Sequence, residues 1–108
     1  MDFTKKHCTP CDGRMPQLTE KEEDDYNKEV ISWNLLREGP HKLRKEFSFK
    51  DFKEAMRFVN VVAEIAEQEG HHPDIYIFYN KVNIELHTHA VSGLSESDFI
   101  MAAKIDAL

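Results

Sequence analysis

The chain contains one long segment, residues 50–69, whose apolar residues recur with the period of an α-helix. The spacing i, i+3, i+4, i+7 places these side chains along one face of a helix. Ser48 or Asp51 is available as the N-cap, and Gly70 suits the left-handed position after the last turn. Pro73 disfavours helix at the residue before it. The segment therefore predicts the central helix of the domain, with these residues facing the core: Phe52, Ala55, Met56, Val59, Val62, Ala63 and Ala66.

Apolar and polar residues alternate on both sides of this helix. Before it, the alternation covers residues 31–49, with a break at Gly39 and Pro40. After it, the same pattern covers residues 75–79 and 82–88. A period of two predicts half-buried strands, and the short connections make each pair an antiparallel hairpin.

Two shorter helices complete the pattern. Thr19 and Glu22 have the spacing of a capping box at the start of a peripheral helix, and Ser95 and Asp98 have it at the start of the last helix. The element order is therefore α-β-β-α-β-β-α. A single four-stranded antiparallel sheet with three helices on one face buries all the apolar stripes, so we predict an α+β two-layer sandwich.

The uncovered face of this sheet is expected to be partly apolar. Trp33, Tyr76 and Phe78 fall on it in the predicted alternation. Apolar patches and open strand edges both favour association with another chain. We therefore expect a homodimer or a homotetramer.

Size and charge limit the classes of protein that this chain can belong to. A chain of 108 residues can bury one hydrophobic core, and 41% hydrophobic with 31% charged residues is typical of a globular domain. The net charge of −6 disfavours sequence-independent binding to nucleic acid. No apolar run approaches the ~18 residues of a membrane span, and the N-terminus lacks the apolar stretch of a signal peptide, so a cytoplasmic protein without membrane contact is expected.

The N-terminal residues differ from the rest of the chain. We expect residues 1–17 to form an irregular arm and residues 18–108 to form the single domain. Cys8 and Cys11 form a C-x-x-C pair in the arm, which is compatible with a redox centre or, together with His7, with half of a zinc site. Prolines and a glycine surround the pair, so a reduced, weakly ordered arm is the simpler interpretation.

Three histidines are candidates for chemistry. His71 and His72 follow the central helix, and His89 follows a strand, so a two-layer fold can bring them together. Imidazole has a pKa near 6.5 and can give or take a proton at neutral pH. Glu67 lies one helical turn before His71, where a carboxylate can fix the tautomer of that ring or its neighbour. From spacing alone, an acid–base site, a metal site and coincidence all remain open, and Asp98 by itself is typical of a helix cap.

The spacing of these residues resembles the signature of the pterin-4a-carbinolamine dehydratase family. The matching series consists of Glu67, the run His71-His72-Pro73, then Tyr79, His89 and Asp98. Three longer stretches also resemble the family's central helix, hairpin and last helix: FSFKDFKEAMRFVNVVAEIAE, YNKVNIELHTH and GLSESDF. The resemblance covers about residues 18–106 and is more specific than any single motif.

The resemblance implies a lyase that removes water from 4a-hydroxytetrahydropterin and so recycles the tetrahydropterin of aromatic amino acid hydroxylases. The family's reaction implies neither a metal nor a further cofactor. Its site residues correspond here to catalytic His71, His72 and His89, to pterin-contacting Pro73, Thr88, Ala90 and Val91, and to supporting Glu67 and Asp98. His87 lies outside the signature and is expected on the surface.

Other functions remain compatible with the sequence. Animal relatives in the family also act as dimerisation cofactors of a homeodomain transcription factor, so a binding module is one alternative. Some members are linked to molybdopterin cofactor metabolism, which is a second. A metal-binding protein that uses the histidines together with Cys8 and Cys11 is a third.

Overall fold

Four antiparallel strands form one sheet in the computed structural model, which describes residues 2–8 and 16–108. The strand order is β1-β2-β4-β3, so the two hairpins meet through β2 and β4 in the middle of the sheet. In this central pair Leu43 lies opposite Leu86, and Phe47 lies opposite Val82. The strands are β1 (Asn34–Leu36), β2 (Lys42–Ser48), β3 (Asp74–Phe78) and β4 (Lys81–Leu86).

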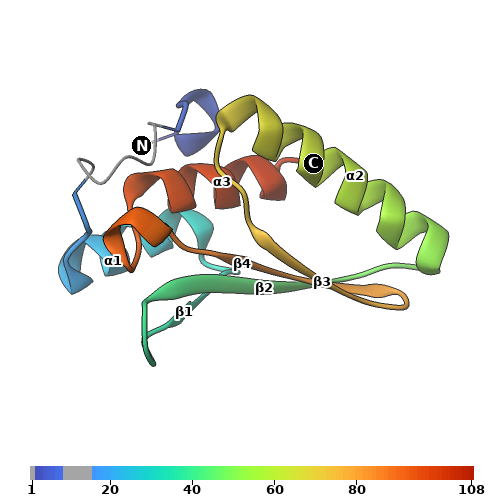
Figure 1. Ribbon diagram of the computed structural model, residues 1–108, viewed down its shortest axis with the longest axis horizontal. Coiled ribbons are helices and arrows are strands. Elements are labelled where there is room, and N and C mark those ends of the chain that lie inside the picture. Colours follow the sequence, from blue (N-terminus) through green and yellow to red (C-terminus); the bar gives the residue numbers. More distant parts are fainter. Residues whose placement is uncertain (1, 9–15) are drawn as a thin grey trace.

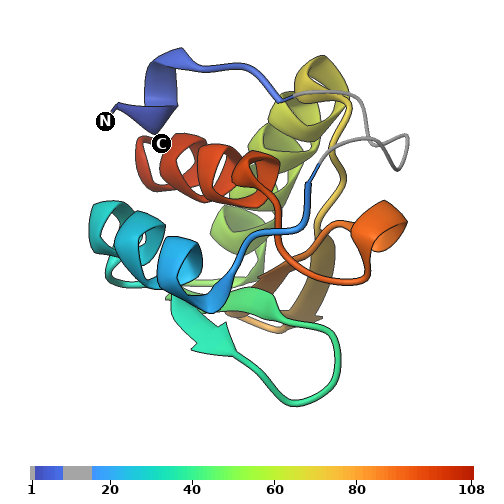
Figure 2. The same ribbon diagram turned by 90° about the vertical axis from the view of Figure 1, so that its left-hand side faces the viewer.

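Helices form a second layer over one face of this sheet, as Figures 1 and 2 show from two directions. They are α1 (Glu20–Asn27), α2 (Phe52–Glu69) and α3 (Glu96–Asp106), with short 3-10 turns at Phe3–Lys5, Lys28–Val30 and His89–Val91. The predicted α+β sandwich is therefore confirmed. Within the described part of the chain, no helix has the length and apolar character needed to cross a membrane.

The helix starts follow the predicted capping chemistry. In α1, the Thr19 hydroxyl accepts the Glu22 N–H at 3.2 Å, and the Glu22 carboxylate accepts the Thr19 N–H at 2.9 Å. The same reciprocal pair occurs at the start of α3. Asp51, one of the two candidates, caps α2 by accepting the Glu54 N–H at 2.9 Å. Gly70 ends α2 with a φ of +65°, the left-handed conformation expected there.

The buried face of α2 is narrower than its apolar pattern suggests. Ala55, Val62 and Ala66 are buried as predicted. Phe52, by contrast, is 49% exposed, because it is the first residue of the helix and no preceding turn covers it. Ala63 is also exposed, because successive residues lie about 100° apart around a helix and Val62 occupies the buried side.

Trp33 corrects the prediction for the outer sheet face. Its side chain is 1% exposed and packs edge-on against Phe47, with 6.0 Å between ring centroids. The alternation from Ile31 misleads because β1 begins only at Asn34, after a turn in which Ile31 is 79% exposed. Residues before the strand therefore do not follow its pleat. Tyr76 and Phe78 are exposed, as expected.

The described part of the N-terminal arm is more ordered than the expected irregular chain. Phe3 is 2% exposed and packs against Tyr26 and Phe99, with centroid distances of 5.3 and 6.3 Å. An apolar anchor of this size explains why the arm lies against the helical layer. Cys8 belongs to this ordered part, whereas Cys11 lies outside the described residues.

Candidate active site

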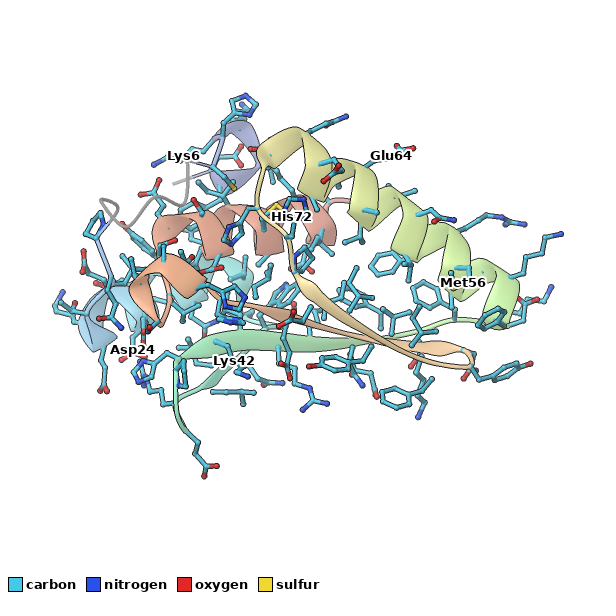
Figure 3. All side chains as sticks on the ribbon, in the orientation of Figure 1. Lys6, Asp24, Lys42, Met56, Glu64 and His72 are labelled. Carbon is cyan, nitrogen blue, oxygen red and sulfur yellow. The ribbon has the colours of Figure 1, made fainter. Side chains whose placement is uncertain are left out.

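Four of the six histidines surround one cavity of about 200 Å³. The cavity lies where the chain leaves α2 and where it leaves β4. Figure 3 shows His72 on the segment between α2 and β3. The lining residues are Gly70, His71, His72, His87, His89 and Ala90. The helix end and the strand end therefore converge, and the three predicted histidines lie together.

His71 is held from below by a buried carboxylate. Its Nε2 lies 2.6 Å from Asp98 Oδ1, and the two side chains are 4% and 0% exposed. The other carboxylate oxygen accepts the Thr88 hydroxyl at 2.8 Å and the Ser95 N–H at 2.9 Å. These donors compensate the carboxylate for its loss of water. The carboxylate keeps a proton on Nε2, so the neutral His71 ring carries its lone pair on Nδ1.

Asp98 thus has two functions that the sequence analysis treated as alternatives. It closes the capping box of α3 with Ser95, and it orients the ring of His71. A carboxylate at the third position of a helix can do both, because one oxygen faces the cap and the other faces away from it.

His72 is paired with the other acidic residue of the predicted site. Its Nε2 lies 2.5 Å from Glu67 Oε2, so Glu67 fixes the ring of His72 rather than that of His71. This pair is open to solvent, since the two side chains are 63% and 77% exposed. The two adjacent imidazoles therefore work in different surroundings, one buried and one exposed.

His89 and its neighbour His87 form the remaining wall of the cavity. His89 begins the 3-10 turn after β4, and its ring centroid lies 4.1 Å from that of His87 at an interplanar angle of 61°. The His87 side chain is 14% exposed, and its Nδ1 lies 3.8 Å from Asp74 Oδ2. His87 is therefore part of the site, which corrects its expected place on the surface.

The strand pattern contained a signal for His87. Side chains two residues apart in extended chain point to the same side, so His87 and His89 share an orientation while Thr88 between them points inward. Thr88 is accordingly 1% exposed and donates to Asp98. A family signature that includes only the second histidine of this pair does not reveal the first.

The residues predicted to contact the pterin are divided by the structure. Ala90 lines the cavity. Pro73 and Val91 are half-buried and are not among its lining residues, and the buried Thr88 donates a hydrogen bond to Asp98. Among the residues that the structure describes, no group of three His, Cys, Asp or Glu side chains has the geometry of a metal site.

Comparison with known families and with individual relatives identifies the same family. Residues 16–108 match the family model described as pterin 4 alpha carbinolamine dehydratase. A relative from Nitrosospira multiformis that carries the same family name is 50% identical over 107 residues, 99% of this chain and 92% of its own. A second, from Alkaliphilus metalliredigens, is 43% identical and covers 97% of this chain and 94% of its own.

Two solved structures share the fold. A crystal structure from Brucella melitensis, titled as a transcriptional coactivator/pterin dehydratase, superposes with a TM-score of 0.80 at 34% identity, covering 85% of this chain and 97% of that one. A pterin dehydratase-like protein identified as a RuBisCO assembly factor in the alpha-carboxysome gives a TM-score of 0.61 at 31% identity, covering 70% of this chain and 87% of that one.

Proposed function

Since the chain belongs to the pterin-4a-carbinolamine dehydratase family, we propose that His71, His72 and His89 perform this dehydration by general acid–base catalysis. The observation that carries the proposal is that all three rings line one cavity, two of them oriented by carboxylates. The substrate is a 4a-hydroxytetrahydropterin, and the products are a quinonoid dihydropterin and water.

The reaction needs two proton transfers at neighbouring atoms of the substrate. The C4a–O bond breaks while a double bond forms between N5 and C4a. Hydroxide is a poor leaving group, so one imidazolium donates a proton to the 4a-oxygen, and a neutral imidazole accepts the N5 proton. Each such positioned transfer contributes about 10²- to 10⁴-fold in rate. Proton exchange between the two rings and solvent restores the starting state.

The carboxylates that pair with the histidines are suited to these proton transfers. Asp98 orients His71 in a buried setting, so its ring keeps one geometry against the bound substrate. Glu67 and His72 are exposed, so a proton can pass between this pair and water. We assign the acid–base work to the three histidines as a group, with Pro73, Ala90 and Val91 around the pterin.

We place this reaction after an oxygenase that releases its pterin as the 4a-hydroxy adduct, such as an aromatic amino acid hydroxylase. The product is an oxidised pterin, so a reductase must follow to regenerate the tetrahydropterin. The binding-module alternative has less support, because it assigns no function to the three histidines that line one cavity.

The decay of enzymatically generated 4a-hydroxytetrahydropterin, followed by ultraviolet absorbance, tests the proposal. We expect His71→Ala, His72→Ala and His89→Ala each to lower kcat by about 10²-fold or more. His41→Ala is the matched control, because His41 is also paired with a carboxylate, that of Glu23, but lies outside the cavity. An inactive wild type, or three fully active variants, would disprove the assignment.

A further inference from the structure

We infer that His87 is a positioning residue for His89, and this inference rests on the proposed function. Each of the other two cavity histidines has a carboxylate partner, Asp98 for His71 and Glu67 for His72. His89 has no such carboxylate among the residues that the structure describes, and its ring contact is with His87. The geometry points to His87 as the equivalent support of the third ring.

The contact is suited to fixing an otherwise exposed side chain. His89 is exposed at the start of a 3-10 turn, where a ring without a neighbour samples several rotamers. The edge of one imidazole against the other, at 4.1 Å between centroids, restricts this freedom on one side. His87 is itself mostly buried, at 14% exposure, so it offers a fixed surface.

Asp74 extends this arrangement by one residue. It is the first residue of β3, and its Oδ2 lies 3.8 Å from His87 Nδ1. This distance exceeds a hydrogen bond but is within the range of an ion pair when the imidazole is protonated. A series of contacts therefore leads from the edge strand to the cavity, through Asp74, His87 and His89. Asp74 itself is not one of the residues that line the cavity.

His87 acts through His89 and does not contact the reacting atoms in this assignment. Removing His87 should therefore lower kcat and leave KM within about 3-fold. Loss of an orienting partner typically costs about 10- to 100-fold in activity. The effect should vanish once His89 is absent, because there is then no ring left to position.

A double-mutant cycle of His87→Ala and His89→Ala in the dehydration assay tests this expectation. We expect His87→Ala alone to lower kcat about 10-fold, and to change kcat less than 2-fold in the His89→Ala background. His87→Asn replaces His87→Ala in the same cycle if the alanine variant is poorly folded. An unchanged kcat for His87→Ala, or equal effects in both backgrounds, would overturn the inference while the proposed function stood.

A second measurement does not depend on activity. Three-bond couplings in the NMR spectrum report the χ1 rotamer populations of His89, and we expect one dominant rotamer in the unmodified protein. His87→Ala should average these populations, whereas His41→Ala should leave them unchanged. If His87→Ala and the unmodified protein had the same distribution of His89 rotamers, the positioning role would be refuted. This result would count even if the protein dehydrated no pterin.

Discussion

The charge of Asp98 matters for the tautomer of His71 as much as for the start of α3. In Asp98→Asn the amide oxygen can still accept from Thr88 and Ser95, but the amide NH2 then faces His71 Nε2. A donor at that place requires the lone pair on Nε2 and moves the proton to Nδ1. We expect kcat to fall by about 10²-fold or more, as measured in the dehydration assay.

A matched control separates this effect from helix capping. Asp51→Asn changes the N-cap of α2 in the same way, far from the histidines in the sequence. Asparagine caps almost as well as aspartate, so this control should keep its kcat and its urea midpoint. Equal losses of kcat in both variants would show that the charge of Asp98 has no special effect on His71.

Glu67 offers the opposite case, a supporting acid on the surface. Exposed ion pairs contribute little to stability, so Glu67→Gln should change the free energy of unfolding by less than about 0.5 kcal/mol. The amide no longer orients His72 as a carboxylate does, and we expect kcat to fall about 10-fold. Glu64→Gln on the same helix, away from His72 in Figure 3, should change neither quantity. Equal kcat values in the two variants would contradict the role of Glu67.

The site residues differ in how far the sequence could reveal them. His71, His72 and His89 were accessible through a family spacing, and Glu67 through its helical turn. The sequence did not reveal which carboxylate pairs with which ring, because a carboxylate one turn away can reach either of two adjacent histidines. The structure pairs Glu67 with His72. His87 was missed because the family spacing includes only His89, although the strand alternation places the two histidines on the same side.

At the scale of the elements, the end of α2 is set by a glycine with a positive φ. Gly70 has a φ of +65° and Gly39 has one of +69°, and an added Cβ would meet no atom within 4 Å at either position. Gly70→Ala and Gly39→Ala should therefore each lose about 1 kcal/mol of stability from backbone strain alone. Urea unfolding measures this loss.

Gly70→Ala and Gly39→Ala should differ in kcat although they lose similar stability. Gly70 lines the cavity and precedes His71, so any relaxation of its φ moves both adjacent histidines. We expect a several-fold lower kcat for Gly70→Ala and an unchanged kcat for Gly39→Ala. A Gly70→Ala variant with wild-type kcat would mean that the loop after α2 does not depend on this conformation.

The last turn of α2 is also tied to the N-terminal arm through Glu69. Its carboxylate accepts the Cys8 N–H at 2.8 Å and lies 3.0 Å from His7 Nδ1 and 3.5 Å from Lys104 Nζ. Burial by itself would raise the pKa of Glu69, but these partners outweigh it and hold the pKa below the ordinary value of 4.5. The carboxylate form is thus favoured in the folded protein.

This shift has a defined effect on the pH dependence of stability. A group whose pKa is lowered on folding stabilises the protein above its unfolded pKa, and the contribution is lost as the pH falls through the folded value. Glu69→Gln should therefore cost about 1–2 kcal/mol at pH 7, and the difference from wild type should shrink below about pH 4.5. Urea unfolding at several pH values checks this. A difference that stays constant down to pH 3 would argue against the ionised pair.

The elements themselves were largely predictable because their signals are local. The capping boxes of α1 and α3 and the glycine after α2 depend on a few neighbouring residues, and all three occur as expected. The positions of Trp33 and of the N-terminal arm were not predictable, because they depend on contacts between residues that are distant in the sequence. Trp33 packs on Phe47, and Phe3 packs against both Tyr26 and Phe99, contacts that no local pattern predicts.

For the molecule as a whole, the sheet has an open edge at β3 that can pair with a strand of another chain. β3 pairs with β4 on one side, and within the described chain no strand lies along its other side. Two of its outward residues are aromatic and exposed, Tyr76 at 45% and Phe78 at 60%. An edge with unpaired backbone groups and exposed aromatic side chains favours pairing with a second copy.

We therefore predict self-association through β3, which light scattering coupled to size-exclusion chromatography measures directly. Phe78→Lys places a charge on this edge, the device by which natural sheets avoid pairing, and should shift the protein toward the monomer. Ile31→Lys introduces the same charge at a residue that is 79% exposed in the turn before β1, and should leave the assembly unchanged. If the monomer already predominates in the wild type, or if both variants dissociate equally, the exposed aromatic residues of β3 do not form the interface.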